Sequence, residues 1–249
     1  MIYTVITGAS SGIGYETALA FAARGKNLII SARRKEKLEE LKKEIQRVNP
    51  AAEVIIQTSD LSVSKNSYAL YDSLKNYEIE TWINNAGFGN FASIGEQNLD
   101  KIEQLLHLNI ESLTILTSLF VRDYADKEGT QLINVSSGGG YTIVADAVTY
   151  CASKFYVSSF TEGLSHELKA KGLPMQAKVL APAATETEFV NRSMEVDEFQ
   201  YNSLPKFHTA KEMAGFMLEL YDSEKTVGIV DGQTYEFHLK DPIFPHVSR

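Results

Sequence analysis

The sequence predicts a doubly wound α/β fold, in which helices cover both faces of a mostly parallel (Rossmann-type) sheet. Three observations lead to this prediction. Short β-branched and apolar runs recur along the chain, helix-period segments separate them, and a glycine-rich turn joins the first run to the first helix. Strands that alternate with helices pair in parallel, because each helix returns the chain to the same edge of the sheet. We therefore expect ligands at the carboxyl ends of the strands.

The first five elements follow from local patterns. Ile2–Thr7 is a β-branched, apolar run that ends at a glycine and predicts a buried strand. Residues 13–24 place apolar side chains at helical spacing. Asn27–Ala32 contains Leu-Ile-Ile and predicts a second strand, and residues 53–57 contain Val-Ile-Ile and predict a third. Between them, Lys35–Val48 is a charged helix with one apolar side that ends before Asn-Pro.

The alternation then continues to the end of the chain. Further helices are expected at residues 64–76, 98–124, 149–171 and 209–222. Further strands are expected at residues 81–84, 131–136, 175–180 and 226–230. No repeat, low-complexity tract or linker divides the sequence, so we expect residues 1–249 to form a single dinucleotide-binding and catalytic domain.

Composition limits the class of protein. The chain has 249 residues, a formal net charge of −8, scattered basic residues and one cysteine, Cys151. Scattered basic residues argue against a nucleic-acid partner, and a lone cysteine fits a reducing compartment. No run approaches the ~18 consecutive apolar residues of a membrane helix, the start of the chain lacks a secretory signal, and the histidines lack metal-ligand spacing. We expect a cytoplasmic protein without metal, membrane or nucleic-acid partners.

The turn between the first strand and the first helix has the features of a phosphate-binding loop. It reads Thr-Gly-Ala-Ser-Ser-Gly-Ile-Gly over residues 7–14. Glycines let the backbone approach a pyrophosphate, and the N-terminus of the helix presents free N–H groups to the anion. Three glycines in a turn also serve packing alone, but the position favours a dinucleotide. The predicted contacts in the turn are Gly8, Ser10, Ser11, Gly12, Ile13 and Gly14.

The end of the second strand distinguishes the two nicotinamide dinucleotides. An acidic residue there would bind the adenosine ribose 2′-hydroxyl, but the sequence has Arg33 and Arg34 instead. Two guanidinium groups favour a 2′-phosphate and hence NADP, because they bind phosphate oxygens in pairs. The alternative is a solvated, charged start of a helix.

Two short segments follow the third and fourth strands, at the edge where adenine and ribose would bind. They are Asp60 with Leu61, and the run Asn84, Asn85, Ala86 and Gly87. Asparagine, aspartate and glycine at strand ends are also ordinary turn formers. Asn109 lies among apolar residues in the middle of the long predicted helix, so it either bonds locally or serves a site.

The candidate chemistry centres on Tyr150 and Lys154, which are four positions apart and share one face of a predicted helix. Tyrosine has a reference pKa near ~10, and a nearby cation would lower that pKa and make the phenol a useful acid or base. Ser137 lies thirteen positions before Tyr150 and could offer a hydroxyl to the same reacting oxygen.

With these motifs in this order, the chain resembles the short-chain dehydrogenase/reductase superfamily, in its single-domain, NADP-preferring branch. The resemblance runs from Thr7 to about Asp231. It implies a catalytic tetrad of Asn109, Ser137, Tyr150 and Lys154, with Tyr150 as general acid or base and Lys154 lowering its pKa and binding the nicotinamide ribose. Asn109 would order a water in the proton path.

The resemblance also implies further cofactor contacts, a substrate class and an assembly. Pro182, Thr185 and Thr187 would lie at the nicotinamide end, although Ala183 replaces the family's usual glycine. The implied activity is NADP(H)-dependent interconversion of a carbonyl and an alcohol by hydride transfer, in a homodimer or homotetramer. A dinucleotide-binding regulatory or scaffold protein on the same fold is the alternative.

A stretch without clear periodicity is expected to shape the substrate site. Residues 188–207 leave the carboxyl end of a strand and are predicted to form a substrate loop or lid, the alternative being a surface helix pair. Phe88, Tyr141 and Phe189 follow site motifs directly and are predicted to line the substrate pocket.

Overall fold

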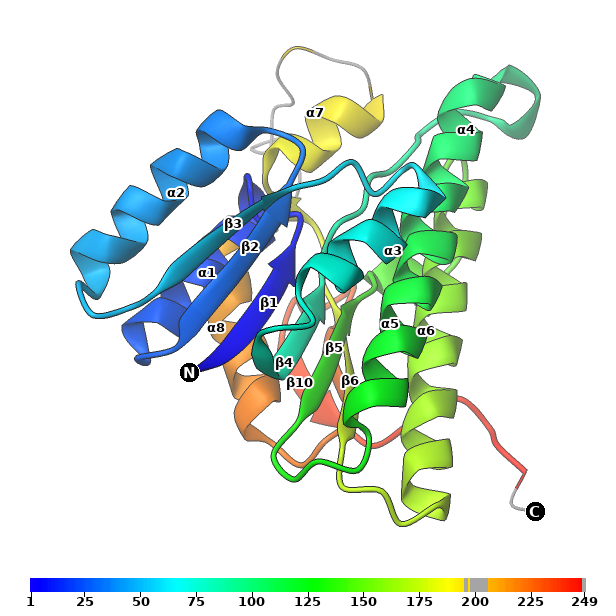
Figure 1. Cartoon of the computed structure of the whole chain (residues 1–249). Helices are drawn as coiled ribbons and strands as arrows, with labels where there is room; N and C mark the ends of the chain where they lie inside the picture. The colour runs from blue at the N-terminus through cyan, green and yellow to red at the C-terminus, as the bar shows by residue number, and fades with distance from the viewer. Residues whose placement is uncertain (195–196, 198–205, 248–249) are drawn as a thin grey trace.

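Eight strands form one twisted sheet in the order β10-β9-β6-β5-β4-β1-β2-β3 (Figure 1). The structure, a computed structural model, describes residues 1–194, 197 and 206–247. All neighbours pair in parallel except β10, which runs antiparallel to β9. The order reverses between β1 and β4, and this switch point is where open α/β sheets bind ligands. The predicted fold class is confirmed.

The strands of this sheet are short, and the central ones are largely buried. Their bounds are β1 (Ile2–Thr7), β2 (Asn27–Ala32), β3 (Val54–Thr58), β4 (Glu78–Asn84), β5 (Gln131–Val135), β6 (Gln176–Ala181), β9 (Val227–Val230) and β10 (Phe237–Lys240). A second, two-stranded sheet pairs β7 (Thr185–Glu186) with β8 (His208–Thr209).

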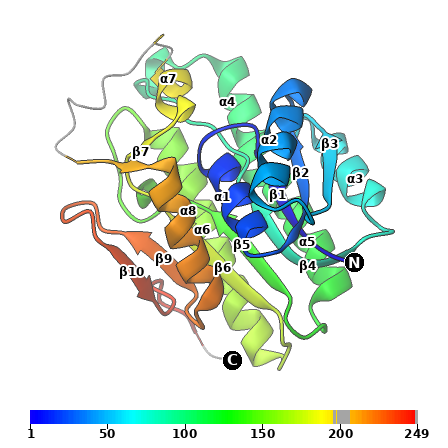
Figure 2. The same ribbon diagram turned by 90° about the vertical axis from the view of Figure 1, so that its left-hand side faces the viewer.

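Helices cover both faces of the main sheet, as Figures 1 and 2 show. One face carries α1 (Gly12–Ala23), α2 (Lys35–Val48) and α8 (Ala210–Asp222). The other face carries α3 (Ser64–Ser73), α5 (Leu113–Tyr124) and α6 (Val148–Ala170). The remaining helical segments are η1 (Ile94–Glu96), α4 (Leu99–Leu106), η2 (His107–Ser112), η3 (Gly138–Gly140) and α7 (Glu188–Met194).

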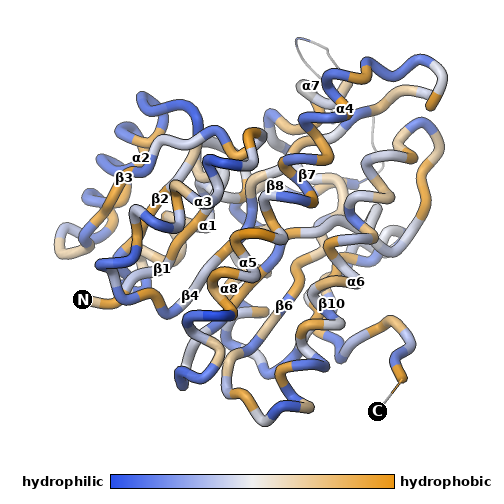
Figure 3. The backbone as a smooth tube through the Cα atoms, turned by 45° about the vertical axis from the view of Figure 1, so that its right-hand side comes forward, coloured by the Kyte–Doolittle hydropathy of each residue, from blue (hydrophilic) through white to orange (hydrophobic). Residues whose placement is uncertain are grey.

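Burial of one apolar face explains why α2 forms despite its many charges. Leu38, Leu41 and Ile45 are fully buried at helical spacing, and the other side of the helix is exposed. Figure 3 shows hydrophilic and hydrophobic positions alternating along this helix. Each fully buried leucine or isoleucine contributes about 1.5–3 kcal/mol to folding, so this face fixes α2 against the sheet.

Lys178 joins β6 to the end of α8. Its side chain is almost fully buried, and Nζ donates to the backbone oxygens of Leu220, Tyr221 and Ser223. The last carbonyls of a helix have no partner within the helix, and a cation there also interacts favourably with the helix dipole. The lysine therefore caps α8 from inside the protein.

The long helix predicted at residues 98–124 is continuous but not regular. A π-helical segment, His107–Ser112, separates α4 from α5, and such segments are frequent at functional sites. By length and composition alone the whole run, Leu99–Tyr124, could cross a membrane. Asn109, Ser112 and Thr117 within it are buried against the rest of the protein, as in helices that cover an α/β sheet.

The predicted substrate loop or lid after β6 begins with a helix. Glu188–Met194 forms helix α7 directly above the carboxyl edge of the sheet (Figure 1). Residues 195–196 and 198–205 of the predicted loop lie outside the described residues. Strand β10 was not predicted, because the segment 237–240 has no apolar run; it pairs with β9.

Candidate active site

The glycine-rich turn connects β1 to α1 and packs closely against two other segments. Gly8 and Gly12 have φ values of +68° and +58°, which favour glycine. A Cβ atom on Gly8 would lie 2.7 Å from the Cα of Ala86, and one on Gly12 would lie 2.9 Å from Cγ2 of Thr187. The predicted contacts after β1, β4 and β6 are thus brought together.

Asn85 fixes the loop after β4 to this turn. Its Nδ2 donates to the backbone oxygens of Thr7 and Gly8, at 3.0 and 3.2 Å. The hydroxyl of Thr7 accepts hydrogen bonds from the backbone N–H groups of Asn85 and Ala86. The Asn85 side chain therefore shapes the turn, and the backbone at Gly12, where α1 begins, remains to receive an anion.

The two arginines after β2 differ in their surroundings. Arg34 lies across the turn, and its Nη2 donates to the hydroxyls of Ser10 and Ser11 at 3.2 and 3.0 Å. Its Nη1 also forms an ion pair of 3.1 Å with Glu188 of α7. Arg33 is exposed, and the part of the chain that the structure describes gives it no hydrogen bond or ion pair.

The predicted cofactor contacts after β3 and β6 are placed near the same edge, with local roles that the structure shows directly. The carboxylate of Asp60 accepts from the backbone N–H and hydroxyl of Ser62, which closes a turn, and Leu61 is buried. Thr185 donates to the backbone oxygen of Ala183, two residues before it. The backbone oxygen of Pro182 accepts a 2.7 Å hydrogen bond from Gly138, which ties the loop after β6 to the turn after β5.

Ser137, Tyr150 and Lys154 converge at the carboxyl edge of β5. Ser137 directly follows Ser136 at the end of the strand, and its hydroxyl is close enough to that of Tyr150 to lower the pKa of the phenol. Tyr150 lies in the first turn of α6 and Lys154 one turn later, and both are buried. Lys154 Nζ donates to the backbone oxygen of Val135 at 2.9 Å and lies 5.9 Å from the centre of the Tyr150 ring.

Asn109 adjoins this group through the π-helical segment. Its Oδ1 accepts from the backbone N–H of Phe88, and its Nδ2 donates to the Phe88 oxygen and to Ser153 Oγ. A Cβ atom on Gly87 would lie 3.1 Å from Asn109 Oδ1 and 3.5 Å from Lys154 Nζ. Asn109 and Lys154 therefore both adjoin Gly87, and Lys154 lies one turn after Tyr150 at the start of α6. Asn109 is fixed there by local bonds as well.

The pKa of Tyr150 differs from the prediction. Burial raises the pKa of Tyr150 to about 12, and the hydrogen bond with Ser137 acts in the opposite direction. The ammonium group of Lys154 is directed to Val135, and burial, rather than this cation, dominates the pKa of the phenol. Burial also lowers the pKa of Lys154 to about 8. At neutral pH the site thus holds a protonated phenol, which is the form that donates a proton.

Two aromatic side chains lie beside Tyr150. The ring centre of Phe189, on α7, lies 5.5 Å from that of Tyr150, and the ring centre of Phe91 lies 6.4 Å away. The prediction for Tyr141 was wrong, because its hydroxyl donates to Glu162 and its ring stacks on Phe244. Phe91 was not among the predicted residues, although the Phe-Gly-Asn-Phe spacing after β4 could have indicated it.

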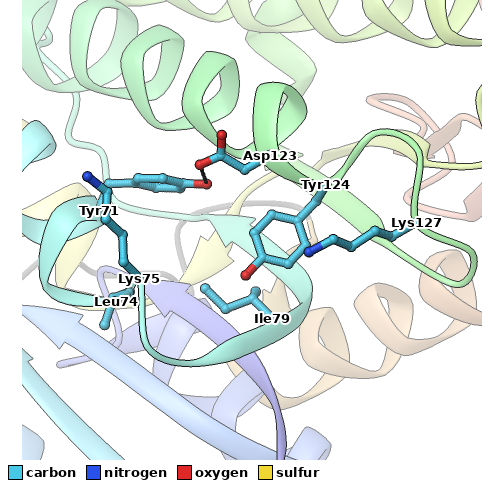
Figure 4. A pocket seen from close by; sticks show the side chains of 7 residues that line it. All are labelled: Tyr71, Leu74, Lys75, Ile79, Asp123, Tyr124 and Lys127. Atoms are coloured by element: carbon cyan, nitrogen blue, oxygen red, sulfur yellow. Dashed lines mark hydrogen bonds between the residues drawn. The ribbon is translucent and has the colours of Figure 1, made fainter.

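A separate hollow lies at the opposite edge of the sheet (Figure 4). Its volume is about 200 Å³, and the ends of α3 and α5 and the start of β4 form its walls. The Tyr71 hydroxyl donates to Asp123 at 2.9 Å, and Lys127 lies over the ring of Tyr124. It contains none of the predicted site residues. In an α/β sheet the chemistry is expected at the carboxyl edge, so this hollow is not the candidate active site.

Comparison with known proteins identifies the family of this chain. A family model described as short chain dehydrogenase matches residues 3–198, which is most of the chain. The protein therefore belongs to the short-chain dehydrogenase family, whose members are oxidoreductases that use NAD(P)(H) and act on alcohols or ketones.

Individual relatives are similar over most of their length. The 17-beta-hydroxysteroid dehydrogenase type 3 of Homo sapiens is 32% identical over 210 residues, which cover 81% of this chain and 67% of that protein. A short-chain dehydrogenase from Sphingobium yanoikuyae in complex with NADPH has a TM-score of 0.84 and 30% identity, covering 92% of this chain and 87% of that one. The bulky-bulky ketone specific alcohol dehydrogenase from Comamonas testosteroni has a TM-score of 0.80 and 28% identity, covering 92% and 86%.

Proposed function

We propose that the protein is an NADP(H)-dependent oxidoreductase that interconverts an apolar ketone and the corresponding alcohol. The convergence of Ser137, Tyr150 and Lys154 at the carboxyl edge of β5, beside the glycine-rich turn, is the observation that carries this proposal. A regulatory protein on the same fold would have no need to bury a phenol against a serine hydroxyl and a lysine.

The glycine-rich turn fits a dinucleotide. Gly8 and Gly12 keep the backbone free of side chains where α1 begins, and the residues after β4 and β6 lie against them. Gly8, Gly12, Gly14 and the N-terminus of α1 would hold the pyrophosphate, and Lys154 and Thr187 the nicotinamide end. When bound, NADPH supplies a hydride.

In reduction, Tyr150 and Ser137 would act on the substrate oxygen. Ser137 donates a hydrogen bond to the carbonyl oxygen, and Tyr150 transfers its phenolic proton to that oxygen as the carbonyl carbon becomes a carbinol carbon. The phenolate that remains would be neutralised by a proton from solvent, along a path that we place beside Asn109 and Lys154. Oxidation uses the same groups in reverse.

Cofactor choice gives the first prediction. We expect Arg33→Ala to raise the Kd for NADPH by about 10–100-fold and to leave the Kd for NADH unchanged, because a charge-assisted bond to phosphate contributes about 1.5–3 kcal/mol. Cofactor fluorescence titration measures both constants. Arg47→Ala, at the exposed far end of α2, is the control and should alter neither. Tighter binding of NADH than NADPH to the wild-type protein would disprove the NADP preference.

The surroundings of Tyr150 favour a neutral, apolar substrate. Residues 86–99 and 138–149, the two segments that lead from β4 and β5 to the site, contain no lysine, arginine or histidine, and Glu96 and Asp146 are their only charged residues. Phe91 and Phe189 offer ring faces beside the reacting hydroxyl. Two of the relatives are by name a hydroxysteroid dehydrogenase and a dehydrogenase of bulky ketones. Residues 188–207 would act as the lid that carries Phe189.

A panel of carbonyl compounds tests the substrate class. With NADPH, we expect aryl and alicyclic ketones to be reduced with a higher kcat/KM than short aldehydes or 3-oxoacyl thioesters. Phe189→Ala should lower kcat/KM for an aryl ketone by about tenfold, as the loss of one aromatic contact costs about 0.5–1.5 kcal/mol plus burial. Phe189→Leu should restore part of it. No oxidation of NADPH with any member of the panel would refute the proposed function.

A further inference from the structure

A segment far from the predicted motifs is bound to helix α6 and to Tyr141, close to the active site. After β10, residues 241–247, here called the strap, pass beside α6 (Figure 1). The backbone N–H groups of Ile243 and Phe244 donate to Oε2 of Glu162, at 2.5 and 2.8 Å. Glu162 lies on α6, twelve residues after Tyr150, and is only 1% exposed.

Glu162 is fully paired without a cation. Its Oε1 accepts a 2.6 Å hydrogen bond from the Tyr141 hydroxyl, and its Oε2 takes the two bonds from the strap. None of the ion pairs among the described residues involves Glu162. A buried carboxylate is costly unless hydrogen bonds replace its hydration, so this residue requires both Tyr141 and the strap in place.

Aromatic packing reinforces the same connection. The ring of Phe244 stacks on that of Tyr141, with ring centres 5.3 Å apart and planes 15° from parallel. Phe244 also contacts Phe155 of α6, at 6.3 Å between ring centres. The strap thus holds Tyr141 in two ways: both bind the Glu162 carboxylate, and the Phe244 ring stacks on the Tyr141 ring.

Tyr141 directly follows the short helical turn that Ser137 begins, η3 with Ser137 (residues 137–140), here called the Ser137 turn. Its backbone N–H donates to the oxygen of Gly138 at 3.0 Å, and Ser137 accepts from Gly139. A Cβ atom on Gly139 would lie 3.5 Å from Ser137 Oγ and 3.7 Å from Cε1 of Tyr150. The turn therefore fills the space between Tyr141 and the Ser137–Tyr150 pair.

The turn has no space in which to shift toward α6. A Cβ atom on Gly140 would lie 2.6 Å from both the backbone oxygen of Lys154 and the hydroxyl of Ser158. The turn is thus held between α6 on one side and Tyr141 with the strap on the other. Release of the strap would free only the outer side.

We propose that the strap is a positioning element of the active site, which acts through Glu162 and Tyr141 to hold the Ser137 turn against Tyr150. The proposal rests on the proposed function in that Ser137 and Tyr150 are taken as the reacting pair. Phe244, Glu162 and Tyr141 are positioning residues, since none of them contacts the reacting hydroxyls.

Phe244→Ala tests this proposal with two measurements. We expect kcat for ketone reduction to fall about tenfold, the effect of about 1.4 kcal/mol on the transition state, with an unchanged Kd for NADPH. Hydrogen exchange, followed by mass spectrometry without substrate, should become faster at residues 138–141 and remain unchanged in β1 and α1. Phe244→Tyr keeps the ring and should restore both properties. Val247→Ala, at a 90% exposed strap residue, is the matched control and should behave as wild type.

The outcomes separate this proposal from the proposed function. Unchanged exchange at residues 138–141 in an active Phe244→Ala enzyme would overturn the role of the strap. Exchange that rises equally throughout the sheet would also overturn it, because the strap would then be a general anchor. A third outcome is faster exchange in Phe244→Ala that is confined to residues 138–141, while the wild-type protein reduces no carbonyl compound. That outcome would support the strap's role in positioning residues 138–141 and would refute the proposed function.

Discussion

Tyr150→Phe is expected to lower kcat for ketone reduction by about 10²–10⁴-fold, the usual contribution of a positioned general acid. The substitution removes only the hydroxyl that Ser137 contacts and keeps the ring that packs against Phe91 and Phe189. The Kd for NADPH should therefore change by less than about twofold. Single-turnover oxidation of NADPH, together with a fluorescence titration of the cofactor, measures both quantities.

Another tyrosine on the same helix provides the control. Tyr156 lies six residues after Tyr150 on α6, and its hydroxyl bonds to Thr114 rather than to a site residue. Tyr156→Phe should retain activity close to that of the wild type. Wild-type turnover by Tyr150→Phe would assign the proton transfer to another group.

Lys154→Met is expected to lower kcat by about 10²–10³-fold and, at neutral pH, to stabilise the fold by about 1–3 kcal/mol. The loss of activity follows from removing a cation beside the reacting groups. The gain in stability follows from burial, which lowers the pKa of Lys154 from 10.5 to about 8. Each pKa unit corresponds to about 1.4 kcal/mol, and the hydrogen bond to Val135 offsets part of the cost of burying the charge. Kinetics and chemical denaturation measure the two effects.

The pH dependence of this gain has a definite sign. The pKa of Lys154 is lower in the folded protein than in the unfolded chain, so the unfolded chain binds more protons between about pH 8 and 10.5 and stability rises with pH there. The excess free energy of unfolding of Lys154→Met over the wild type should be largest below pH 8 and should vanish near pH 10.5. Burial also lowers the pKa of Lys178 to about 8, so this residue contributes the same pH dependence in both proteins. The quantity to compare is therefore the free energy of unfolding of Lys154→Met minus that of the wild type at each pH. A destabilised Met variant at pH 7 would contradict this account.

Spacing of apolar residues and of glycines along the sequence predicted the helices, strands and turns that such spacing determines. The bounds of β1, β2 and α2 agree with the structure, because burial of regularly spaced apolar residues defines these elements. The glycine-rich turn was recognisable because positive φ angles and close packing both require glycine. The spacing of Tyr150 and Lys154 on one helix face predicted that they would lie side by side.

Contacts between distant segments could not be predicted in the same way. The direction of Tyr141 depends on Glu162, and the burial of Glu162 depends on the strap, which lies 81 residues further along the chain. The pKa of Tyr150 also follows from burial and from where Lys154 points, neither of which spacing determines. Asn109 was noticed as a polar residue among apolar ones, but the π-helical segment that directs it toward Phe88 has no sequence signature.

The transfer of deuterium from labelled NADPH tests the central claim most directly. NADPH deuterated at the transferred position of nicotinamide C4 is incubated with the protein and an aryl ketone, and the alcohol is analysed by mass spectrometry. The account predicts one deuterium on the carbinol carbon with the wild-type protein, and almost no labelled alcohol in the same time with Tyr150→Phe. Alcohol formed without deuterium, or labelled equally fast by the Tyr150→Phe variant, would contradict hydride transfer assisted by Tyr150.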